Sequence, residues 1–511
     1  MPHAPRRADH RHRMAGLGRA LALVGGVAVG AFALRWIFLR QRQVALCPTP
    51  YQTAPIGPEQ VAPQRRRIVL SDLHMGAGDR LDDFVDDAAL IEFLDHYVSN
   101  GAPTELILAG DTFELLQVRL PALDDNEYSD AVAALRVEAI LTAHAAVFAA
   151  LARFLAAPQH QLTVLIGNHD FELHFPAAKA RLAAALSVTH DDERLRFGIS
   201  YHGGGVYIVH GNQFDGWNRF VHFAGISEPF EVVRGTQLVK EVINELEDDT
   251  LPLAPLIDNV KPSSALFWHL MALPRLRNAA SRRFLAHGVA GFLQVMAWPP
   301  PHQMPISGRG PGGLLSALPL GGLWRRVAHF RRGRVARQRE WSRQVGAVAS
   351  VVEPPYEVLN QMRSEAARQV AREQRAFSDR FAREMLALAR RPEHHTDAIF
   401  VCGHTHLACV VPLGLGQIYV NTGTWTEIIY DIAAMRAQEQ RFPFLEITYP
   451  TDQRPLGRLL VWIGPGAAPV PWHNGHTRLR QSKSPTDDLH ANETALDDRT
   501  TEARSAQRPN W

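Results

Sequence analysis

The sequence predicts an α/β fold. Short apolar runs typical of strands are each followed at once by glycine and polar residues, and residues 131–156 show the apolar spacing of a core-packing helix. In open α/β architectures, ligands bind beyond the carboxyl ends of the strands. The 511 residues are 46% hydrophobic and 21% charged, which excludes a wholly disordered chain, a collagen and a polytopic membrane protein.

Overall charge and cysteine content say little about function. The 54 Lys and Arg residues are balanced by 52 Asp and Glu, so net charge identifies no partner. The three cysteines are too few for a disulfide scaffold, and their spacing matches no zinc motif. The 24 histidines are more informative, because several stand beside Asp or Asn at the ends of predicted strands.

Residues 1–45 predict a basic leader and a single-pass membrane anchor. Five arginines precede the uncharged run from Ala20 to Leu34, and apolar character continues past Arg35 to Leu39. This length matches the roughly 20 residues of a membrane span. The arginine excess before the run favours a cytoplasmic N-terminus. A cleaved signal peptide and a disordered leader are the alternatives.

Two further segments have the composition of non-globular chain. Residues 46–64 contain five prolines, which predicts an extended linker between the anchor and the catalytic domain. Residues 466–511 are polar with few large apolar side chains, which predicts a disordered tail.

Five predicted strands lead into blocks with metal-binding chemistry. The strands are followed, in order, by Ser71-Asp72-Leu73-His74, Gly110-Asp111-Thr112-Phe113-Glu114, Gly167-Asn168-His169-Asp170, His210-Gly211-Asn212 and Gly403-His404-Thr405-His406. Strand ends in such a fold face one site, so we expect these blocks to converge. The glycines beside them allow the backbone to turn sharply and to approach a ligand closely.

The donor types in these blocks suit a particular class of metal site. Carboxylate and amide oxygens with imidazole nitrogens favour manganese, iron or zinc over copper–thiolate or iron–sulfur chemistry. The donors are too many for one tetrahedral zinc ion, and their number suits two divalent ions that share a bridging carboxylate. Two such ions can clamp a phosphate and lower the pKa of a water between them.

With all five blocks present and in order, the chain resembles the calcineurin-like metallophosphoesterases. The resemblance covers about residues 66–215 and 396–465, and it implies two packed β-sheets flanked by helices with a dinuclear site at one edge. It therefore predicts a metal-dependent phosphoesterase domain formed by residues 65–215 and 396–465. The implied ligands are Asp72, His74 and His406 for one ion, Asn168, His210 and His404 for the other, and Asp111 as the bridge.

The resemblance also implies catalytic residues. His169 would stand beside the phosphate as a general acid or transition-state donor, and Asp170 would orient it. Asn212 and Asp215 follow His210 and are candidate substrate-binding residues. Glu114 is expected either to fix a neighbouring group or to cap the following helix.

Within the family, two features are similar to the bacterial UDP-2,3-diacylglucosamine pyrophosphatases: the Gly-Asp-x-Phe-Glu block and a large insert after His210. Those enzymes usually carry Arg where this chain has His169, and their insert is shorter. Their substrate is therefore not transferred to this chain. What remains is the expectation of a capped phosphoesterase that faces lipid.

Residues 216–395 predict a helical insert that forms a cap. Residues 261–345 within it carry fourteen Lys and Arg against one acid, Glu340, with Trp, Phe and Leu interleaved. This composition favours an anionic membrane surface. A solvated basic subdomain and a nucleic-acid-binding surface are the alternatives.

We therefore expect a membrane-associated phosphoesterase that hydrolyses a phosphomonoester, phosphodiester or pyrophosphate bond. A nuclease of the same superfamily and a membrane-surface scaffold that retained the site are the alternatives. The remaining histidines are expected to be structural: His144 and His174 in packing, His202 in a loop, and His394 in a hinge, with a substrate role as the alternative for His394.

Overall fold

The computed structural model describes most of the predicted catalytic domain. The described residues are 46–62, 65–121, 123–189, 191–244, 378–431, 436–437, 442–450 and 454–472. The predicted anchor, the basic stretch 261–345 and nearly all of the predicted tail lie outside them. Among the described residues no single helix is long and apolar enough to cross a membrane.

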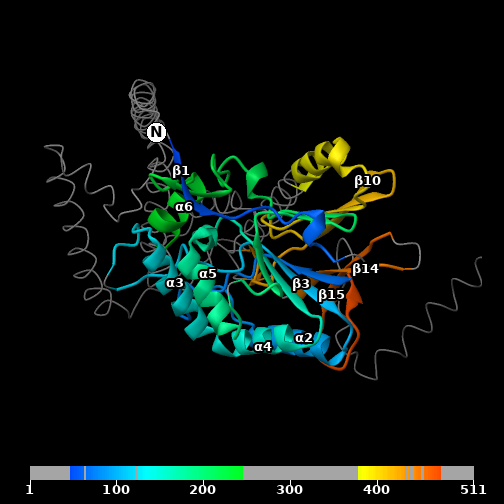
Figure 1. Cartoon of the computed structure of the whole chain (residues 1–511), viewed down its shortest axis with the longest axis horizontal. Helices are drawn as coiled ribbons and strands as arrows, with labels where there is room; N and C mark the ends of the chain where they lie inside the picture. The colour runs from blue at the N-terminus through cyan, green and yellow to red at the C-terminus, as the bar shows by residue number, and fades with distance from the viewer. Residues whose placement is uncertain are drawn as a thin grey trace, which may run out of the picture. The chain divides into compact units, whose positions relative to one another are not determined.

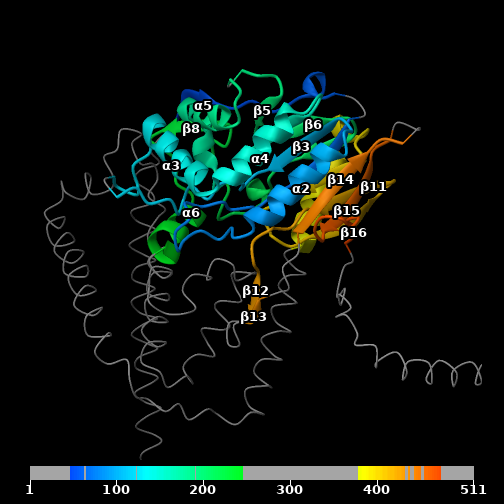
Figure 2. The same cartoon turned by 90° about the horizontal axis from the view of Figure 1, so that it is seen from below.

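The described core contains two main β-sheets, which confirms the predicted fold class (Figures 1 and 2). The larger sheet has seven strands in the order β16-β15-β14-β2-β3-β4-β5. Strands β2 to β5 are parallel, and β14 pairs antiparallel with β2. The strands are β2 (Arg66–Leu70), β3 (Thr104–Ala109), β4 (Gln161–Leu165), β5 (Leu195–Gly198), β14 (Phe442–Thr448), β15 (Leu456–Trp462) and β16 (Val470–Pro471).

The second sheet has five strands in the order β10-β11-β9-β7-β6. Strand β9 is parallel to both β7 and β11, so the carboxyl ends of β7 and β9 lie at the same edge. The strands are β6 (Tyr201–Gly203), β7 (Val206–Ile208), β9 (Ile399–Cys402), β10 (Cys409–Gly414) and β11 (Gln417–Asn421). Two-stranded pairs are formed by β1 (Cys47–Gln52) with β8 (Gly225–Glu228) and by β12 (Ile429–Asp431) with β13 (Arg436–Ala437).

Four helices pack on one face of the seven-stranded sheet, as Figure 2 shows. They are α2 (Asp87–Ser99), α3 (Asp130–Ala143), α4 (Ala145–Ala156) and α5 (Pro176–Ala185). In α4 the buried residues Val147, Phe148, Leu151, Phe154 and Leu155 recur at helical spacing and form one apolar face.

The single helix predicted over residues 131–156 is instead the pair α3 and α4, which meet at an angle of 93°. The break occurs at His144, whose backbone leaves helical geometry. Its Nδ1 lies 2.7 Å from Oδ1 of Asp87 and its Nε2 lies 2.9 Å from Oδ2 of Asp82. His144 is thus structural, as expected, and it fixes the corner between the two helices.

The segment predicted as a linker belongs to the folded domain. Strand β1 pairs antiparallel with β8, and the side chains of Ile56 and Val61 are buried. Prolines are tolerated in this strand because it has a partner on one side only, so a missing N–H need not break a ladder. The prolines of residues 46–64 therefore do not indicate an extended linker.

The folded domain also extends into both ends of the predicted insert, residues 216–395. Phe220, Ile226 and Phe230 are part of the main apolar core, and Phe381 and Met385 of a helical stretch at 378–389 are buried beneath the second sheet. Strand β16 likewise extends the domain beyond residue 465. The catalytic domain therefore includes residues on both sides of the insert that the sequence assigned to the cap or the tail.

Candidate metal centre

The predicted ligand blocks follow the carboxyl ends of β2, β3, β4, β7 and β9, and the structure brings them together. Among the predicted ligands, two groups of side chains have ligand atoms within 4.8 Å of one another. Asp72, His74 and His406 form the first group, and Asp111, His210 and His404 form the second. The grouping divides the residues as the family resemblance implies, with Asn168 considered separately below.

The first group joins the two sheets. Nε2 of His74 lies 3.1 Å from Nε2 of His406, and the latter lies 3.4 Å from Oδ1 of Asp72. The backbone N–H of His404 donates to the same Asp72 oxygen over 2.9 Å, so the loop after β9 is fixed against the loop after β2. Side chains more than 330 positions apart in the chain therefore share one site.

The second group is centred on Asp111. Its Oδ2 lies 2.9 Å from Nε2 of His210, and its Oδ1 accepts the backbone N–H of His169. Nδ1 of His210 lies 3.1 Å from the carbonyl oxygen of Ala109, which orients the ring so that Nε2 faces the carboxylate. The placement of Asp111 beside both sheets suits the bridging role implied for it.

The buried carboxylates of the site favour the binding of cations. Asp72, Asp111 and Asp170 are each at most 1% exposed, and uncompensated buried carboxylates are costly. Burial and the nearby Asp111 raise the pKa of Asp170 to about 7. Burial alone would lower the pKa of His210, but the surrounding carboxylates, Asp111 foremost, raise it to about 9. Divalent ions would neutralise the same negative charge.

Asn168 provides an independent test of whether metal ions fit the site. Its side chain is buried, and its Oδ1 forms no hydrogen bond with any described residue. Burying an amide oxygen without a partner costs about 1–3 kcal/mol. Coordination of a cation would satisfy this oxygen, so the residues present fit the implied ions.

The backbone is unusual at the same positions. Among the described residues, eight other than glycine have a positive φ, and five of them are predicted ligands: Asp72 (53°), His74 (50°), Asp111 (50°), His404 (66°) and His406 (59°). Such conformations are uncommon outside glycine and concentrate at functional sites, where the surrounding structure holds them. The ligand loops are therefore built to direct these side chains rather than to relax the backbone.

Two glycines in the blocks permit close approach. A Cβ atom at Gly167 would lie 2.2 Å from Oδ1 of Asp111, and one at Gly403 would lie 2.2 Å from Oδ2 of Asp72. No side chain fits at either position without displacing a predicted ligand.

Residues 65–263 match the family described as calcineurin-like phosphoesterase. The chain carries a calcineurin-like phosphoesterase domain. Proteins of this family are metal-dependent hydrolases of phosphoric esters with a dinuclear divalent metal centre, so this chain is a metal-dependent phosphoesterase that uses two divalent ions. The matched range ends before β9, and the structure supplies the remaining two histidines of the site, His404 and His406, from the later chain segment. No curated protein matches the chain.

Within the phosphoesterase domain, Glu114 takes the role expected of Asp170. Oε2 of Glu114 lies 2.6 Å from Nδ1 of His169 and 2.7 Å from Nδ1 of His74. Burial alone would raise the pKa of Glu114, but the two histidines, His169 foremost, lower it to about 2. Glu114 thus fixes two imidazoles at once, which is the first of the two roles expected for it.

Asp170 instead stabilises the backbone of the ligand loops. Its Oδ1 accepts the N–H of Gly167 over 2.5 Å and its Oδ2 accepts that of Thr112 over 2.9 Å. The expectation that Asp170 orients His169 is therefore corrected. A carboxylate next in sequence to a histidine has its side chain directed elsewhere by the loop, whereas Glu114 reaches the ring from the neighbouring strand end.

The two candidate substrate-binding residues differ in position. Oδ2 of Asp215 lies 3.1 Å from Nε2 of His404, and although burial would raise the pKa of Asp215, the bond to His404 helps to lower it to about 2. Asn212 is fully buried and its Nδ2 donates to the carbonyl oxygen of Asn218. Asp215 therefore lies at the metal site, while Asn212 stabilises the loop that carries it.

Several residues at the phosphoesterase site were missed or left as structural. Oγ of Ser71 lies 2.5 Å from Oδ2 of Asp72, and Oγ1 of Thr424 donates to the carbonyl oxygen of Asp72. Nδ2 of Asn421 donates to the carbonyl oxygen of Gly403, and its Oδ1 accepts the N–H of Gly423, so Asn421 holds the turn that follows β11. Ser71 stands directly beside Asp72 in the sequence, and that position was the signal that could have identified it. Thr424 lies well after His406, and no local pattern points to it.

A narrow space beside the metal site has an aromatic lining. Asn168 and His169 line one part of it, and the rings of Tyr128, Phe171, Phe220 and Phe230 line another. Phe171 stacks on Phe220 and Tyr128 on Phe230, each with ring centroids 3.9 Å apart. These four rings are at most 6% exposed and belong to the main apolar core, so they pack the region beside the metal site against itself.

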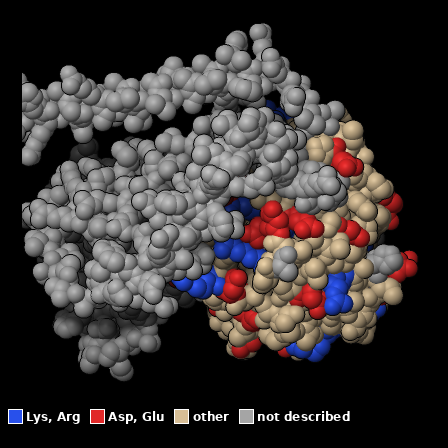
Figure 3. All heavy atoms as spheres, turned by 90° about the vertical axis from the view of Figure 1, so that its left-hand side faces the viewer, with Lys and Arg blue, Asp and Glu red and all other residues tan. Residues whose placement is uncertain are grey.

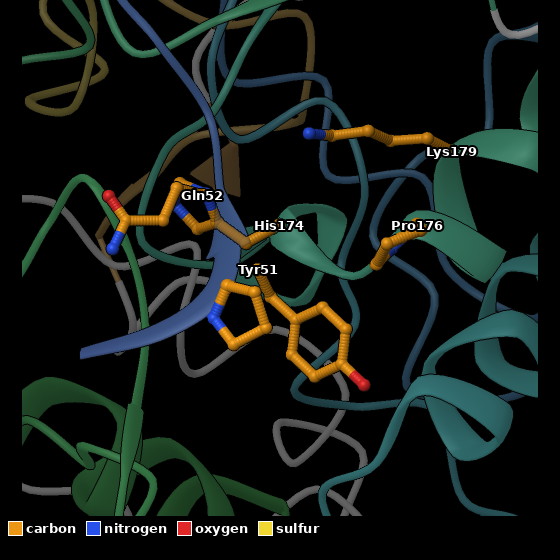
Figure 4. Close-up of a pocket in the computed structure, with 6 residues that line it drawn as sticks. Tyr51, Gln52, His174, Pro176 and Lys179 are labelled. Carbon is orange, nitrogen blue, oxygen red and sulfur yellow. The ribbon is translucent and has the colours of Figure 1, made fainter. Parts of the chain in front are cut away.

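A second cavity contains none of the predicted ligands. It is lined by Pro50, Tyr51, Gln52, His174, Pro176 and Lys179, most of which are labelled in Figure 4. His174 is buried there with its Nδ1 2.9 Å from Oγ1 of Thr53, in keeping with the packing role expected for it. Burial, with a contribution from Lys179, lowers the pKa of His174 to about 3.

Proposed function

We propose that this phosphoesterase hydrolyses phosphoesters that carry a large apolar group, at or near a membrane surface. The observation that carries the proposal is the stretch 261–345, where fourteen Lys and Arg stand against one acid and Trp, Phe and Leu are interleaved. Burial of apolar surface contributes about 25 cal/mol per Å², so the Trp, Phe and Leu side chains of this stretch would add membrane binding that salt does not screen.

The residues of the site have separable tasks in this reaction. The seven predicted ligands would hold the two ions, which would supply Lewis-acid polarisation of the phosphoryl group and a bound water of lowered pKa. Glu114 accepts a hydrogen bond from Nδ1 of His169 and so fixes the ring. Nε2 is then the atom from which His169 can donate a proton to the leaving oxygen. Asp215, 3.1 Å from His404, orients that ring in turn.

The mixed oxygen and nitrogen donors support manganese, iron or zinc as the native ions. We propose manganese as the first ion to test, because the three oxygen donors from Asp and Asn suit it, with zinc and iron, which the four histidines favour, as the comparison.

Support for the membrane part comes from the sequence. On the face shown in Figure 3, acidic and basic side chains of the described domain lie beside one another, so this face offers no surface of one sign. The basic and apolar residues 261–345 and the apolar run near the N-terminus are the features that favour an anionic bilayer and a single-pass anchor.

A substrate comparison with the manganese-loaded full-length protein tests the proposal. Replacement of Trp268, Phe284, Trp298 and Trp324 by Ser removes bulky apolar side chains from the basic stretch, and Phe197→Ala, on β5, is the control. Loss of one buried aromatic contact costs about 1.5–3 kcal/mol, so kcat/KM for a long-chain lipid phosphoester in anionic vesicles should fall at least roughly 10-fold in the fourfold variant. Hydrolysis of a small soluble phosphodiester should change far less.

Equal losses on both substrates, with an unchanged melting temperature, would show that these four residues do not act through a membrane surface. Greater activity on single-stranded DNA than on any lipid ester would support the nuclease alternative. Liposome co-sedimentation provides a second arm: binding to anionic vesicles that persists at high salt favours the membrane, whereas nucleic-acid binding should collapse as salt rises.

A further inference from the structure

A second cluster of metal-binding side chains lies at the opposite end of the five-stranded sheet. His202 is on β6, His394 ends the 3-10 helix η7 (Pro392–His394), and Asp397 precedes β9. The predicted catalytic ligands His210 and His404 follow the carboxyl ends of β7 and β9, which are parallel. Asp397 precedes the amino end of β9, and His202 pairs with Tyr207 within β7.

The three side chains converge on one point. Oδ2 of Asp397 lies 2.9 Å from Nε2 of His202 and 2.7 Å from Nδ1 of His394, and the two imidazole centroids are 4.9 Å apart. The predicted catalytic ligands approach one another as closely, with 2.9 Å between His210 and Asp111. His202 and His394 were expected to be loop and hinge residues, whereas the structure places His202 on a strand and buries His394.

The surroundings hold this cluster in place. His394 and Asp397 are buried, and the ring of Tyr207 packs edge-on against His394 at 4.4 Å. Nε2 of Gln417 donates to the carbonyl oxygen of Asp397 over 2.9 Å, which fixes the loop that carries two of the three side chains. The side chain of His202 is 27% exposed, so the cluster is accessible from solvent.

We propose that His202, His394 and Asp397 bind a third divalent ion, separate from the dinuclear centre. Two imidazoles and a carboxylate suit zinc, which commonly takes three protein ligands and one water. Bond lengths of 2.0–2.1 Å in a tetrahedral site place ligand atoms about 3.3 Å apart, so zinc needs only a small expansion of the observed cluster.

This ion would have a structural task. Strand β9 begins just after the chain returns from the insert, and β6 belongs to the segment before it. An ion bound by His202, His394 and Asp397 would cross-link the two segments and hold β9 in register with β7. The competing interpretation is a carboxylate that accepts hydrogen bonds from two imidazoles without a metal.

Metal analysis of the full-length protein separates the two interpretations. After chelation and reloading with zinc, the ions bound per chain are counted by mass spectrometry for the wild type, His202→Ala, Asp397→Asn and the control His395→Ala. His395 is the exposed neighbour of His394. The wild type and His395→Ala should each bind about one ion more than the other two variants, and zinc should raise their melting temperatures further.

Asp397→Asn keeps a hydrogen-bond acceptor but is a weaker metal ligand, so it distinguishes lost coordination from lost hydrogen bonding. Retained hydrolysis of a soluble phosphodiester shows that each variant is folded and that its dinuclear centre is intact. Cobalt(II) gives a second readout, since loss of this site should remove part of the visible absorption. Equal zinc content and equal cobalt spectra in all four proteins would overturn the proposal.

Discussion

Replacement of Glu114 by Gln tests whether one carboxylate sets two functions of the site. Its Oε2 lies 2.7 Å from Nδ1 of His74, a predicted ligand, and 2.6 Å from Nδ1 of His169, the predicted acid. Hydrogen bonds to a charged group contribute about 1.5–3 kcal/mol, and neutral ones about 0.5–1.5. The change should therefore cost about 1 to 1.5 kcal/mol at each histidine.

The total of about 2 to 3 kcal/mol corresponds to a roughly 30- to 150-fold fall in kcat/KM. The assay is hydrolysis of a chromogenic aryl phosphodiester by the manganese-loaded protein, with metal affinity measured separately by titration. Glu92→Gln, at an exposed position of α2, is the matched control and should leave both quantities unchanged.

A double-mutant cycle identifies the path of the effect. In a His169→Ala background, Glu114→Gln should lose only the part that acts through His74, so the two changes should couple by about 1 to 1.5 kcal/mol. If Glu114→Gln costs the same in both backgrounds, Glu114 does not act through His169 and the reasoning above fails.

Three further predictions follow from the site and its surroundings. Asp111→Asn should lower metal content and abolish hydrolysis, whereas His169→Ala should keep the metal and lose turnover; equal metal loss in both, by elemental analysis, would contradict the division of roles. A chain that begins at Leu46 should keep its melting temperature and its activity on a soluble diester, whereas one that begins at Ala62 loses β1 and the buried Ile56 and should melt at a clearly lower temperature. Burial lowers the pKa of His174 from its ordinary 6.5 to about 3, so as the pH falls the unfolded chain takes up a proton before the folded chain does. The contribution of His174 to the free energy of unfolding is therefore complete above pH 6.5 and is lost as the pH drops towards 3, with a loss of about 2 kcal/mol at pH 5. Denaturant titrations should show a shallower dependence of this free energy on pH in His174→Gln.

Much of the sheet could be predicted because its strands are local patterns. Ile68–Leu70, Leu106–Ala109 and Leu162–Ile166 are apolar runs that end in glycine or polar residues, and each matches an observed parallel strand. The ligand blocks were visible for the same reason: their residue types and spacing are written within a few positions. Parallel strands buried on both faces leave this signature without help from distant contacts.

What the sequence missed depends on contacts between distant segments. The role of Glu114 is set by rings that arrive from the loops after β2 and β4, and no local spacing encodes that approach. The turn at His144 depends on two aspartates more than 50 positions earlier. The prolines of residues 46–64 predict a linker, whereas the structure has strand β1 there. Pairing with the distant strand β8 makes this composition acceptable, and no local pattern reveals that pairing.

The pairing of β14 with β2 has a consequence for biosynthesis. Strand β2 ends at Leu70 and its outer neighbour begins at Phe442, so about 370 residues must be translated between them. At about 5–20 residues per second, roughly 20 to 75 s pass before the ribosome delivers the strand that covers this edge. Throughout that interval the nascent sheet presents an open row of N–H and C=O groups of the kind that recruits other chains. The last two histidines of the site, on the loop after β9, are also made late, so the site is complete only after translation has passed His406.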